Sequence, residues 1–217
     1  MKKRGICYII AAMPERELYF APGEKFIIAA DAGLSQLCEI GISPDLCVGD
    51  FDSLGYVPDG VEVIYHRPEK DDTDTMLAVR EALDRGYEKF VFYGAAGGRL
   101  DHTYANLQTL LFLTERGARG IVMAGGLAVT AISGGSIALG SKNRGVVSVF
   151  CHDGRASGVN ISGLKYPLSG ATLKSSFPLG VSNEFTGERA EIAVESGSLM
   201  IMWETDAKSA IDELYFA

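Results

Sequence analysis

GDFDS (residues 49–53), KDDTD (70–74) and GGRLDH (97–102) are the three sequences around which this chain is organised, and each comes after a strand-like apolar segment. Carboxylates gathered in one place repel one another, and each resists desolvation. A globular protein that gathers them usually neutralises them, and a hard divalent cation carrying phosphates is the usual means. The pattern therefore predicts a magnesium-dependent enzyme that acts on a nucleoside triphosphate.

Strand-like runs and helical spacing alternate through the first half of the chain. We expect strands over residues 6–12, 26–30, 46–48, 61–66, 90–93 and 121–124, with helices after three of them. This alternation is typical of an α/β domain with a parallel, doubly wound sheet. Such sheets bind ligands outside the carboxyl ends of their strands. We therefore expect one rim to hold the residues that directly follow strands, which are Asp31, Asp50, Asp52 and Gly94.

The pattern changes at residues 124–128. Beyond them, short β-rich runs are separated by Gly, Ser and Asn, which favours an antiparallel sandwich or barrel. We expect runs over 129–132, 136–139, 146–151, 171–173, 190–194 and 199–203, a polar turn over 180–185 and a short helix over 207–217. The predicted fold is thus α/β followed by all-β: a nucleotide-binding domain at 1–125 and a β-sandwich domain at 126–217.

The composition excludes some classes of partner. The 217 residues carry a formal net charge of -8, which argues against nucleic acid or an anionic membrane surface, because both require a basic face. No apolar run is long enough to span a membrane. The four cysteines form no CxxC pair, as expected of reduced thiols in a cytoplasmic protein.

The first acidic sequence places Asp50 and Asp52 two residues apart. In an extended chain these two side chains point the same way, so the pair could bridge one or two metal ions. Ser53 could cap a following turn or join the metal shell. A turn held by aspartate side chains is an alternative of nearly equal weight.

The second acidic sequence begins a predicted helix. Acidic residues favour the first helical turn, with Asp72 or Thr73 as the N-cap, but capping requires one aspartate and not three in four positions. The excess favours a functional role for Asp71 and Asp74. Lys70 beside them could reach a phosphate.

The third sequence follows the glycine-rich turn at 94–98, whose backbone N–H groups could cradle a phosphate at a helix N-terminus. Its spacing fits neither the dinucleotide fingerprint nor the Walker A loop. Arg99, Asp101 and His102 add a phosphate donor, a carboxylate and a titratable ring, although a capped helix start with an exposed histidine is a serious alternative. Asp31 could hold a nucleotide hydroxyl or a metal-bound water, or it could simply cap a helix.

The order and spacing of these motifs resemble one family. The resemblance rests on DAG (31–33), SPDLCVGDFDS (43–53), KDDTDT (70–75), GGRLDH with Asn106 beyond it, GLKYPL (163–168) and VSNEF (181–185). It covers essentially the whole length, and the chain resembles the bacterial thiamine pyrophosphokinases. The family often has Trp where Tyr166 stands, and this substitution keeps an aromatic ring.

The resemblance implies transfer of the pyrophosphoryl group of ATP to thiamine, giving thiamine diphosphate and AMP, with Mg²⁺. It also implies a homodimer with its active sites between subunits. The implied catalytic carboxylates are Asp50, Asp52, Asp71 and Asp74, of which Asp50, Asp52 and Asp74 are the expected metal ligands. The implied ATP contacts are Asp31, Ser53, Lys70, Thr73, Gly97, Arg99, Asp101, His102 and Asn106. The implied thiamine contacts are Ser182, Asn183 and Trp203, although a tryptophan on a strand is usually a core residue.

Two other functions compete with this one. A metal-dependent phosphohydrolase could use the same carboxylates with water as the nucleophile. A nucleotide sensor without catalysis could use the β-rich domain to bind a partner, but it would not need so many carboxylates.

Overall fold

The computed structural model describes residues 2–51, 55–65 and 72–216. Its strands form one 12-stranded sheet, in which the order along the main path is β10-β9-β12-β7-β6-β5-β1-β2-β3-β4. The first half of the chain contains β1 (Ile6–Ile10), β2 (Lys25–Ala30), α1 (Gly33–Glu39), β3 (Leu46–Gly49), β4 (Glu62–Tyr65), α2 (Asp74–Asp84), β5 (Lys89–Tyr93), α3 (Leu100–Thr114) and β6 (Arg119–Ala124). The second half contains β7 (Leu127–Leu139), β8 (Val146–Cys151), β9 (Arg155–Ser162), β10 (Leu168–Lys174), β11 (Gly180–Glu184), β12 (Ala190–Glu204) and α4 (Ala207–Tyr215).

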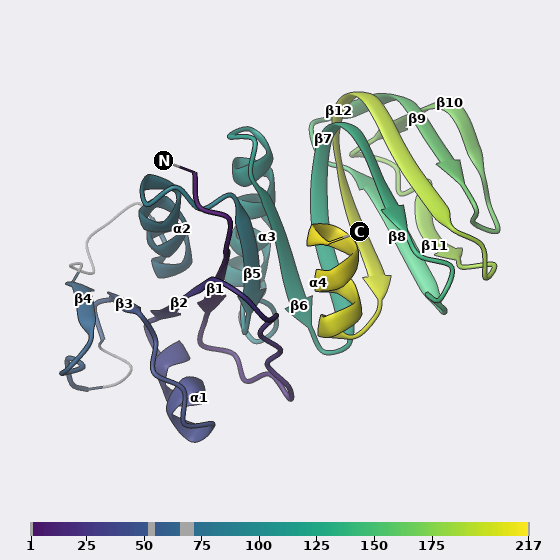
Figure 1. Ribbon diagram of the computed structural model, residues 1–217. Coiled ribbons are helices and arrows are strands. Elements are labelled where there is room, and N and C mark those ends of the chain that lie inside the picture. Colours follow the sequence, from purple (N-terminus) through teal and green to yellow (C-terminus); the bar gives the residue numbers. More distant parts are fainter. Residues whose placement is uncertain (1, 52–54, 66–71, 217) are drawn as a thin grey trace.

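The strands from β1 to β6 pair in parallel, as predicted. The central strand β1 is buried along its whole length because helices cover both faces of the sheet. Leu34 and Leu37 of α1 pack on one face, whereas Ala78 and Val79 of α2 pack with Leu110 of α3 on the other. Figure 1 shows α1 on the opposite side of the strands from α2 and α3.

A tight turn joins the parallel strands to the β-rich half. Gly125 and Gly126 both have positive φ, which is the conformation that a two-residue hairpin turn requires. The turn pairs β6 with β7 in antiparallel register, so the sheet continues from one half into the other. The sequence change at 124–128 therefore marks a hairpin in a mixed sheet.

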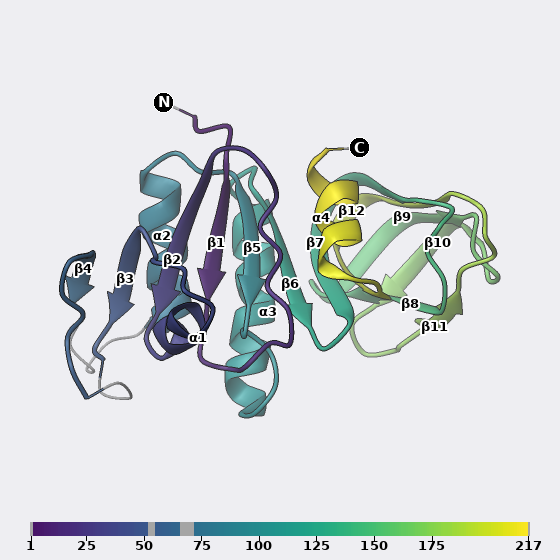
Figure 2. The same ribbon diagram turned by 60° about the horizontal axis from the view of Figure 1, so that its bottom comes forward.

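The β-rich half is built on two long strands, β7 and β12, which pair along most of their length. The first part of β12 also pairs with β9 and the second part with β8, so β9–β10 and β8–β11 extend from opposite ends of it. Figure 2 shows β9 and β10 behind β8 and β11. Apolar residues of these strands fill the space between the two pairs, as in a sandwich core. The predicted α/β region followed by a β-rich region is confirmed at this level.

Three predictions for this half are wrong in detail. The runs predicted at 129–132 and 136–139 belong to one strand, β7, which bends at Gly134 and Gly135, both with positive φ. The runs predicted at 190–194 and 199–203 likewise belong to β12, whose register shifts between Val194 and Ser198. The polar turn expected at 180–185 is strand β11, and β9 was not expected at all.

The predicted C-terminal helix is confirmed as α4. Its N-cap is Asp206, whose carboxylate accepts hydrogen bonds from the backbone N–H and the hydroxyl of Ser209, at 2.9 Å and 2.7 Å. Ala210, Ile211 and Leu214 of α4 join the core on the α1 side of the sheet. Within the described residues, no helix has the length and hydropathy needed to cross a membrane.

Candidate active site

A cavity of about 390 Å³ lies at the carboxyl ends of the parallel strands. Loops after β1, β2, β3 and β5 contribute to its wall, together with the first turns of α2 and α3. Its lining residues are Ala11, Ala12, Met13, Ala30, Asp31, Asp50, Asp72, Thr73, Asp74, Thr75, Leu77, Gly94, Ala95, Gly97, Arg99, His102 and Asn106. The structure thus brings together parts of all three acidic sequences, as expected for residues that follow parallel strands.

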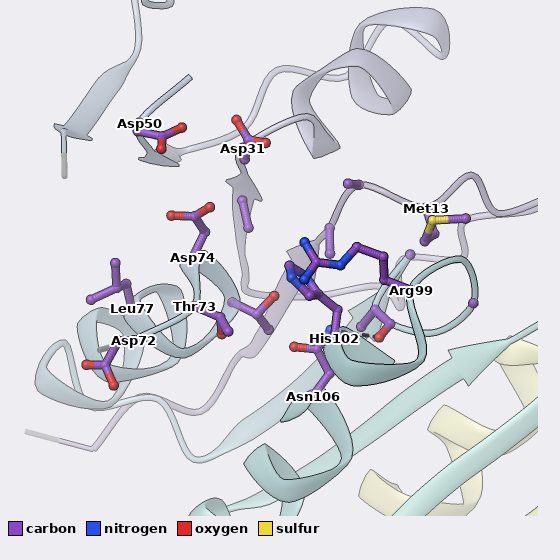
Figure 3. Close-up of a pocket in the computed structure, with 17 residues that line it drawn as sticks. Met13, Asp31, Asp50, Asp72, Thr73, Asp74, Leu77, Arg99, His102 and Asn106 are labelled. Carbon is purple, nitrogen blue, oxygen red and sulfur yellow. Dashed lines mark hydrogen bonds between the residues drawn. The ribbon is translucent and has the colours of Figure 1, made fainter. Parts of the chain in front are cut away.

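Three carboxylates from separate elements share this cavity. Figure 3 shows Asp31, Asp50 and Asp74 on the same side of it, after β2, after β3 and at the start of α2. Asp31 has a φ of 46° and a buried Oδ1 that accepts no hydrogen bond from the described residues. A buried carboxylate oxygen without a partner costs free energy, which a bound cation or donor would offset. This oxygen points to a ligand that the cavity can receive.

The metal prediction is tested only in part. Within residues 2–51, 55–65 and 72–216, no three His, Cys, Asp or Glu side chains form a group that could hold a metal ion. Four predicted site residues, Asp52, Ser53, Lys70 and Asp71, lie outside the described ranges. The predicted three-carboxylate set of Asp50, Asp52 and Asp74 therefore stays a prediction.

The three polar residues at the start of α2, Asp72, Thr73 and Asp74, have different contacts. Thr73 is the N-cap, and its Oγ1 accepts a hydrogen bond from the backbone N–H of Met76 at 3.2 Å. Asp72 forms an ion pair with Arg80 at 3.2 Å, and Figure 3 shows its carboxylate turned away from Asp31 and Asp50. Thr73 and Asp72 therefore have structural partners within the chain, and both also line the cavity together with Asp74.

Side chains of α3 form hydrogen bonds to the glycine-rich turn after β5. Gly94, Gly97 and Gly98 all have positive φ, so side chains would strain this backbone. Nδ2 of the buried Asn106 donates to the carbonyl oxygen of Ala95 at 2.7 Å, and Thr103 Oγ1 accepts from the N–H of Gly97 at 3.0 Å. Asn106, predicted as a nucleotide contact, thus also fixes the turn.

Arg99 lines the cavity, and Asp101 holds its guanidinium. Nη2 of Arg99 donates to Oδ2 of Asp101 at 2.6 Å and Nε donates to Oδ1 at 3.1 Å. This hydrogen-bonded guanidinium lowers the pKa of Asp101 to about 2. Both side chains are exposed, so Arg99 could exchange this partner for a phosphate. His102 lines the cavity beside Arg99, whereas Asp101 lies outside the lining.

The segment after β1 belongs to the site, although no residue of it was predicted there. Ala11, Ala12 and Met13 line the cavity, and a Cβ on Gly98 would lie 2.7 Å from the sulfur of Met13. The signal was available, because β1 was predicted as a buried parallel strand and its carboxyl end must share the rim with the others. The segment was overlooked because Ala11, Ala12 and Met13 carry no charged side chain.

The two family motifs of the β-rich half, GLKYPL (163–168) and VSNEF (181–185), lie side by side. Oδ1 of Asn183 accepts from the backbone N–H of Tyr166 at 2.9 Å, and Nδ2 donates to the carbonyl oxygen of Tyr166 at 2.8 Å. Ser182, with φ 58°, donates its N–H to Ser148 Oγ at 3.0 Å. A pocket of about 270 Å³ beside them is lined by Ile161, Tyr166, Leu168, Leu179, Gly180, Val181 and Asn183.

Trp203 lies elsewhere. It is 1% exposed in the core of the β-rich half, so it offers no surface to a ligand of this chain. The core interpretation of this tryptophan therefore explains its position, and the thiamine contact of Trp203 stays a prediction. Both views also place the motif strand β11 at the opposite end of the molecule from α2 and β3 (Figures 1 and 2).

Family models match both halves of the chain. The model described as "Thiamin pyrophosphokinase, catalytic domain" matches residues 20–122, and the one described as "Thiamin pyrophosphokinase, vitamin B1 binding domain" matches residues 137–200. The chain belongs to the thiamin pyrophosphokinase family. The family resemblance predicted from the motifs is confirmed, and with it the prediction of a thiamine diphosphokinase. These matches do not support the phosphohydrolase alternative.

Individual thiamin pyrophosphokinases also match this chain over most of its length. The thiamine pyrophosphokinase of Bacillus subtilis is 25% identical over 82% of this chain and 87% of its own length. A crystal structure of thiamine pyrophosphokinase from the same species superposes with a TM-score of 0.83, at 23% identity, over 93% of this chain and 99% of its own. A family protein from Enterococcus faecalis superposes with a TM-score of 0.77, at 26% identity, over the same shares. The predicted α/β and β-rich architecture is therefore the fold of this family.

Proposed function

We propose that this chain transfers the pyrophosphoryl group of ATP to the hydroxyethyl group of thiamine, giving thiamine diphosphate and AMP. The observation that carries the proposal is the shared cavity of Asp31, Asp50 and Asp74 with Arg99 at its edge, at the carboxyl ends of the parallel strands. Charges of both signs around one cavity suit a polyphosphate that arrives with a cation.

The parallel half acts in this proposal as a doubly wound nucleotide-binding domain, at 1–125. The chain runs outward from β1 to β4 and then returns to β5 and β6 on the other side of β1. Ligands of open α/β sheets bind where the strand order reverses in this way. The cavity lies beside the ends of β1 and β5, and its glycine turn precedes the N-terminus of α3, which favours phosphate.

Asp50 and Asp74, completed by Asp52, would hold Mg²⁺ in this cavity. Carboxylates from separate elements are the donor set that hard cations prefer, and the buried Oδ1 of Asp31 could accept a hydrogen bond from a metal-bound water. Bound Mg²⁺ would neutralise negative charge on the phosphate oxygens. The residues present therefore fit the ion.

Side chains of the protein bind the phosphates, accept the proton and position the nucleotide. Arg99 binds the phosphates once it leaves Asp101, and Lys70 adds a second positive charge. Asp71 or Asp74 accepts or orients the proton of the thiamine hydroxyl as it attacks the β-phosphorus. Thr73, Gly97, His102 and Asn106 position the nucleotide. Alignment of two substrates and compensation of charge provide most of the rate in phosphoryl transfer.

Thiamine binds, in this proposal, between two subunits of a homodimer. Ser182 and Asn183 belong to β11, which both views place at the opposite end of the molecule from α2 and β3 (Figures 1 and 2). The backbone of Tyr166 is hydrogen-bonded to Asn183, and the ring of Tyr166 is exposed. A second copy could bring its β-rich end, at 126–217, against the acidic rim of the first. Tyr166, Leu179 and Val181 are each about half exposed, which suits burial against a partner.

We also place the enzyme in the cytoplasm. All four cysteines are free thiols, and Cys7, Cys47 and Cys151 are buried. Burial raises the pKa of the Cys7 and Cys47 thiols, which keeps them protonated and unreactive. Free thiols of this kind are usual in a reducing compartment.

A product assay tests the proposed reaction. Purified protein is incubated with ATP, Mg²⁺ and thiamine, the nucleotides and thiamine esters are separated, and the assay is repeated with a chelator. We expect AMP and thiamine diphosphate in equal amounts, only with thiamine and only without chelator. Nucleotide hydrolysis that ignores thiamine would indicate the phosphohydrolase, and tight ATP binding without any turnover would indicate the sensor.

A further inference from the structure

The side chain of Gln36 holds the segment after β1 at three points. Gln36 lies in α1, and its Nε2 donates to the carbonyl oxygen of Ala11 at 2.9 Å and to that of Met13 at 2.7 Å. Its Oε1 accepts from the backbone N–H of Glu15 at 3.0 Å. Both ends of the amide are therefore used, and they fix five consecutive residues that lead out of the sheet.

The same carbonyl groups lie close to Gly94. A Cβ on Gly94 would lie 2.3 Å from the carbonyl oxygen of Met13 and 2.6 Å from that of Ala11. The N–H of Met13 donates to the carbonyl oxygen of Gly94 at 3.1 Å. The segment is thus clamped between Gln36 of α1 and Gly94 of the glycine turn, where a side chain would not fit.

The clamp joins three parts of the cavity wall. Ala11, Ala12 and Met13 line the cavity directly, Gly94 begins the glycine turn, and Asp31 lies two residues before the start of α1. Met13 also packs its sulfur over Gly98 in that turn. Gln36 itself lies outside the lining, so it acts on the cavity through these neighbours.

We propose that Gln36 is a positioning residue, whose amide sets the spacing between the β1 exit and the glycine turn and so shapes the nucleotide side of the cavity. The proposal rests on the proposed function for its kinetic consequence. No other side-chain type of this length can replace the amide. A glutamate would present a carboxylate to two carbonyl oxygens, and a methionine would leave those carbonyl groups without their donor.

Three variants test the proposal. Gln36→Glu and Gln36→Met remove the donor with little change in size, and Gln108→Glu makes the same chemical change at an exposed position of α3. For both Gln36 variants we expect the KM for ATP to rise about tenfold, because the wall that meets the phosphates is displaced, while the KM for thiamine changes less than twofold. Gln108→Glu should match the unchanged protein in both constants.

Amide hydrogen exchange provides a readout that does not depend on turnover. In the Gln36 variants, peptides that cover residues 11–15 and 94–98 should exchange about tenfold faster, while peptides from β12 should not change. Unchanged exchange in these segments would overturn the clamp. Equal rises of both KM values, or loss of a cooperative thermal transition in both variants, would also overturn it, because Gln36 would then serve the fold as a whole.

The two proposals can fail separately. If the unchanged protein forms no AMP with thiamine, the proposed function fails, but exchange at 11–15 and 94–98 still decides whether Gln36 holds the wall. If AMP forms and the Gln36 variants retain the KM for ATP, the positioning role fails and the function stands.

Discussion

At the rim of the parallel strands the family motifs place Asp31, Asp50 and Asp74 around a cavity, whereas in the β-rich half the motif residue Asn183 is 4% exposed and fully engaged with the backbone of Tyr166. The rim therefore keeps polar groups for a ligand, with a buried oxygen of Asp31 that no described residue satisfies. In the β-rich half the Asn183 amide is hydrogen-bonded to the neighbouring backbone, and the ring of Tyr166 is exposed. In the proposed function, the first region receives charge and the second receives a flat organic ring.

The largest effect should come from the rim. Asp74→Asn keeps the size of the side chain at the start of α2 but removes its charge. Turnover should fall by about 10²- to 10³-fold, which is the usual loss when one group that stabilises charge in the transition state is removed. Steady-state kcat measures the loss, and circular dichroism checks the fold. Asp84→Asn, at the exposed end of the same helix, is the control and should retain normal turnover. Near-normal kcat in Asp74→Asn would remove Asp74 from the site.

The next effect should be on stability and should come from the β-rich motif. Asn183→Ala leaves the backbone N–H and C=O of Tyr166 without partners, so the free energy of unfolding should fall by about 2 kcal/mol. Asn160→Ala removes comparable bonds, to Gly158 and Gly170, at an exposed site and should cost less than about 1 kcal/mol. Denaturant titration compares the two variants. Equal losses would mean that burial of Asn183 does not matter.

A smaller effect is expected for the exposed ring. Tyr166→Ala should raise the KM for thiamine about tenfold with little change in the KM for ATP, because the ring is 56% exposed and contributes little to the fold. Tyr56→Ala, with a ring exposed to nearly the same extent, is the control. A rise in the KM for ATP instead would place the β-rich pocket in the nucleotide site and break the contrast between the regions.

The smallest effect concerns the α4 cap and pH. Hydrogen bonds from the N–H and hydroxyl of Ser209 lower the pKa of Asp206. A lowered folded-state pKa adds stability that is complete above the unfolded value near ~3.9 and is lost as pH falls through the folded value. Asp206→Ala should cost about 0.5 to 1 kcal/mol at pH 7, since the group is exposed.

The control for this prediction is Asp206→Asn, which still caps the helix but cannot titrate. Thermal melts from pH 7 to pH 2.5 should show the Asn variant losing less stability than the unchanged protein across the acid range. Parallel pH curves for the two proteins would contradict the role of the Asp206 charge.

The sequence allowed the parallel half to be predicted well, because each buried strand is a continuous apolar run and each helix has an apolar stripe. Thr73 illustrates the limit within the site. The apolar helical pattern predicts Asp72 or Thr73 as the cap, but only the fold shows that Thr73 is the cap and that Asp72 turns to Arg80. The direction of a side chain depends on partners that are distant in sequence.

The β-rich half was harder to predict for a physical reason. Its strands β7 and β12 bend through glycine and serine positions that look like turns in sequence, and the short alternation of β9 is interrupted by Gly158. Gly125-Gly126 was interpreted as a boundary, yet the same pair fits a hairpin turn that lets the sheet continue. Gln36 carried no signal at all, since its partners are backbone groups: two carbonyl oxygens and one N–H.

Subunit complementation tests most directly whether the two regions are halves of one site. Asp74→Asn and Tyr166→Ala chains are co-expressed with different tags, and the mixed dimer preparation is purified. Thiamine-dependent AMP formation is compared with that of each variant alone at a thiamine concentration well below the KM of the unchanged protein, where the Tyr166→Ala chain alone has about a tenth of normal activity. If each active site takes its acidic rim from one subunit and its β-rich pocket from the other, random pairing should restore about a quarter of normal activity, because half of the dimers then contain one site without either substitution. Activity no greater than the average of the two separate variants would contradict the account.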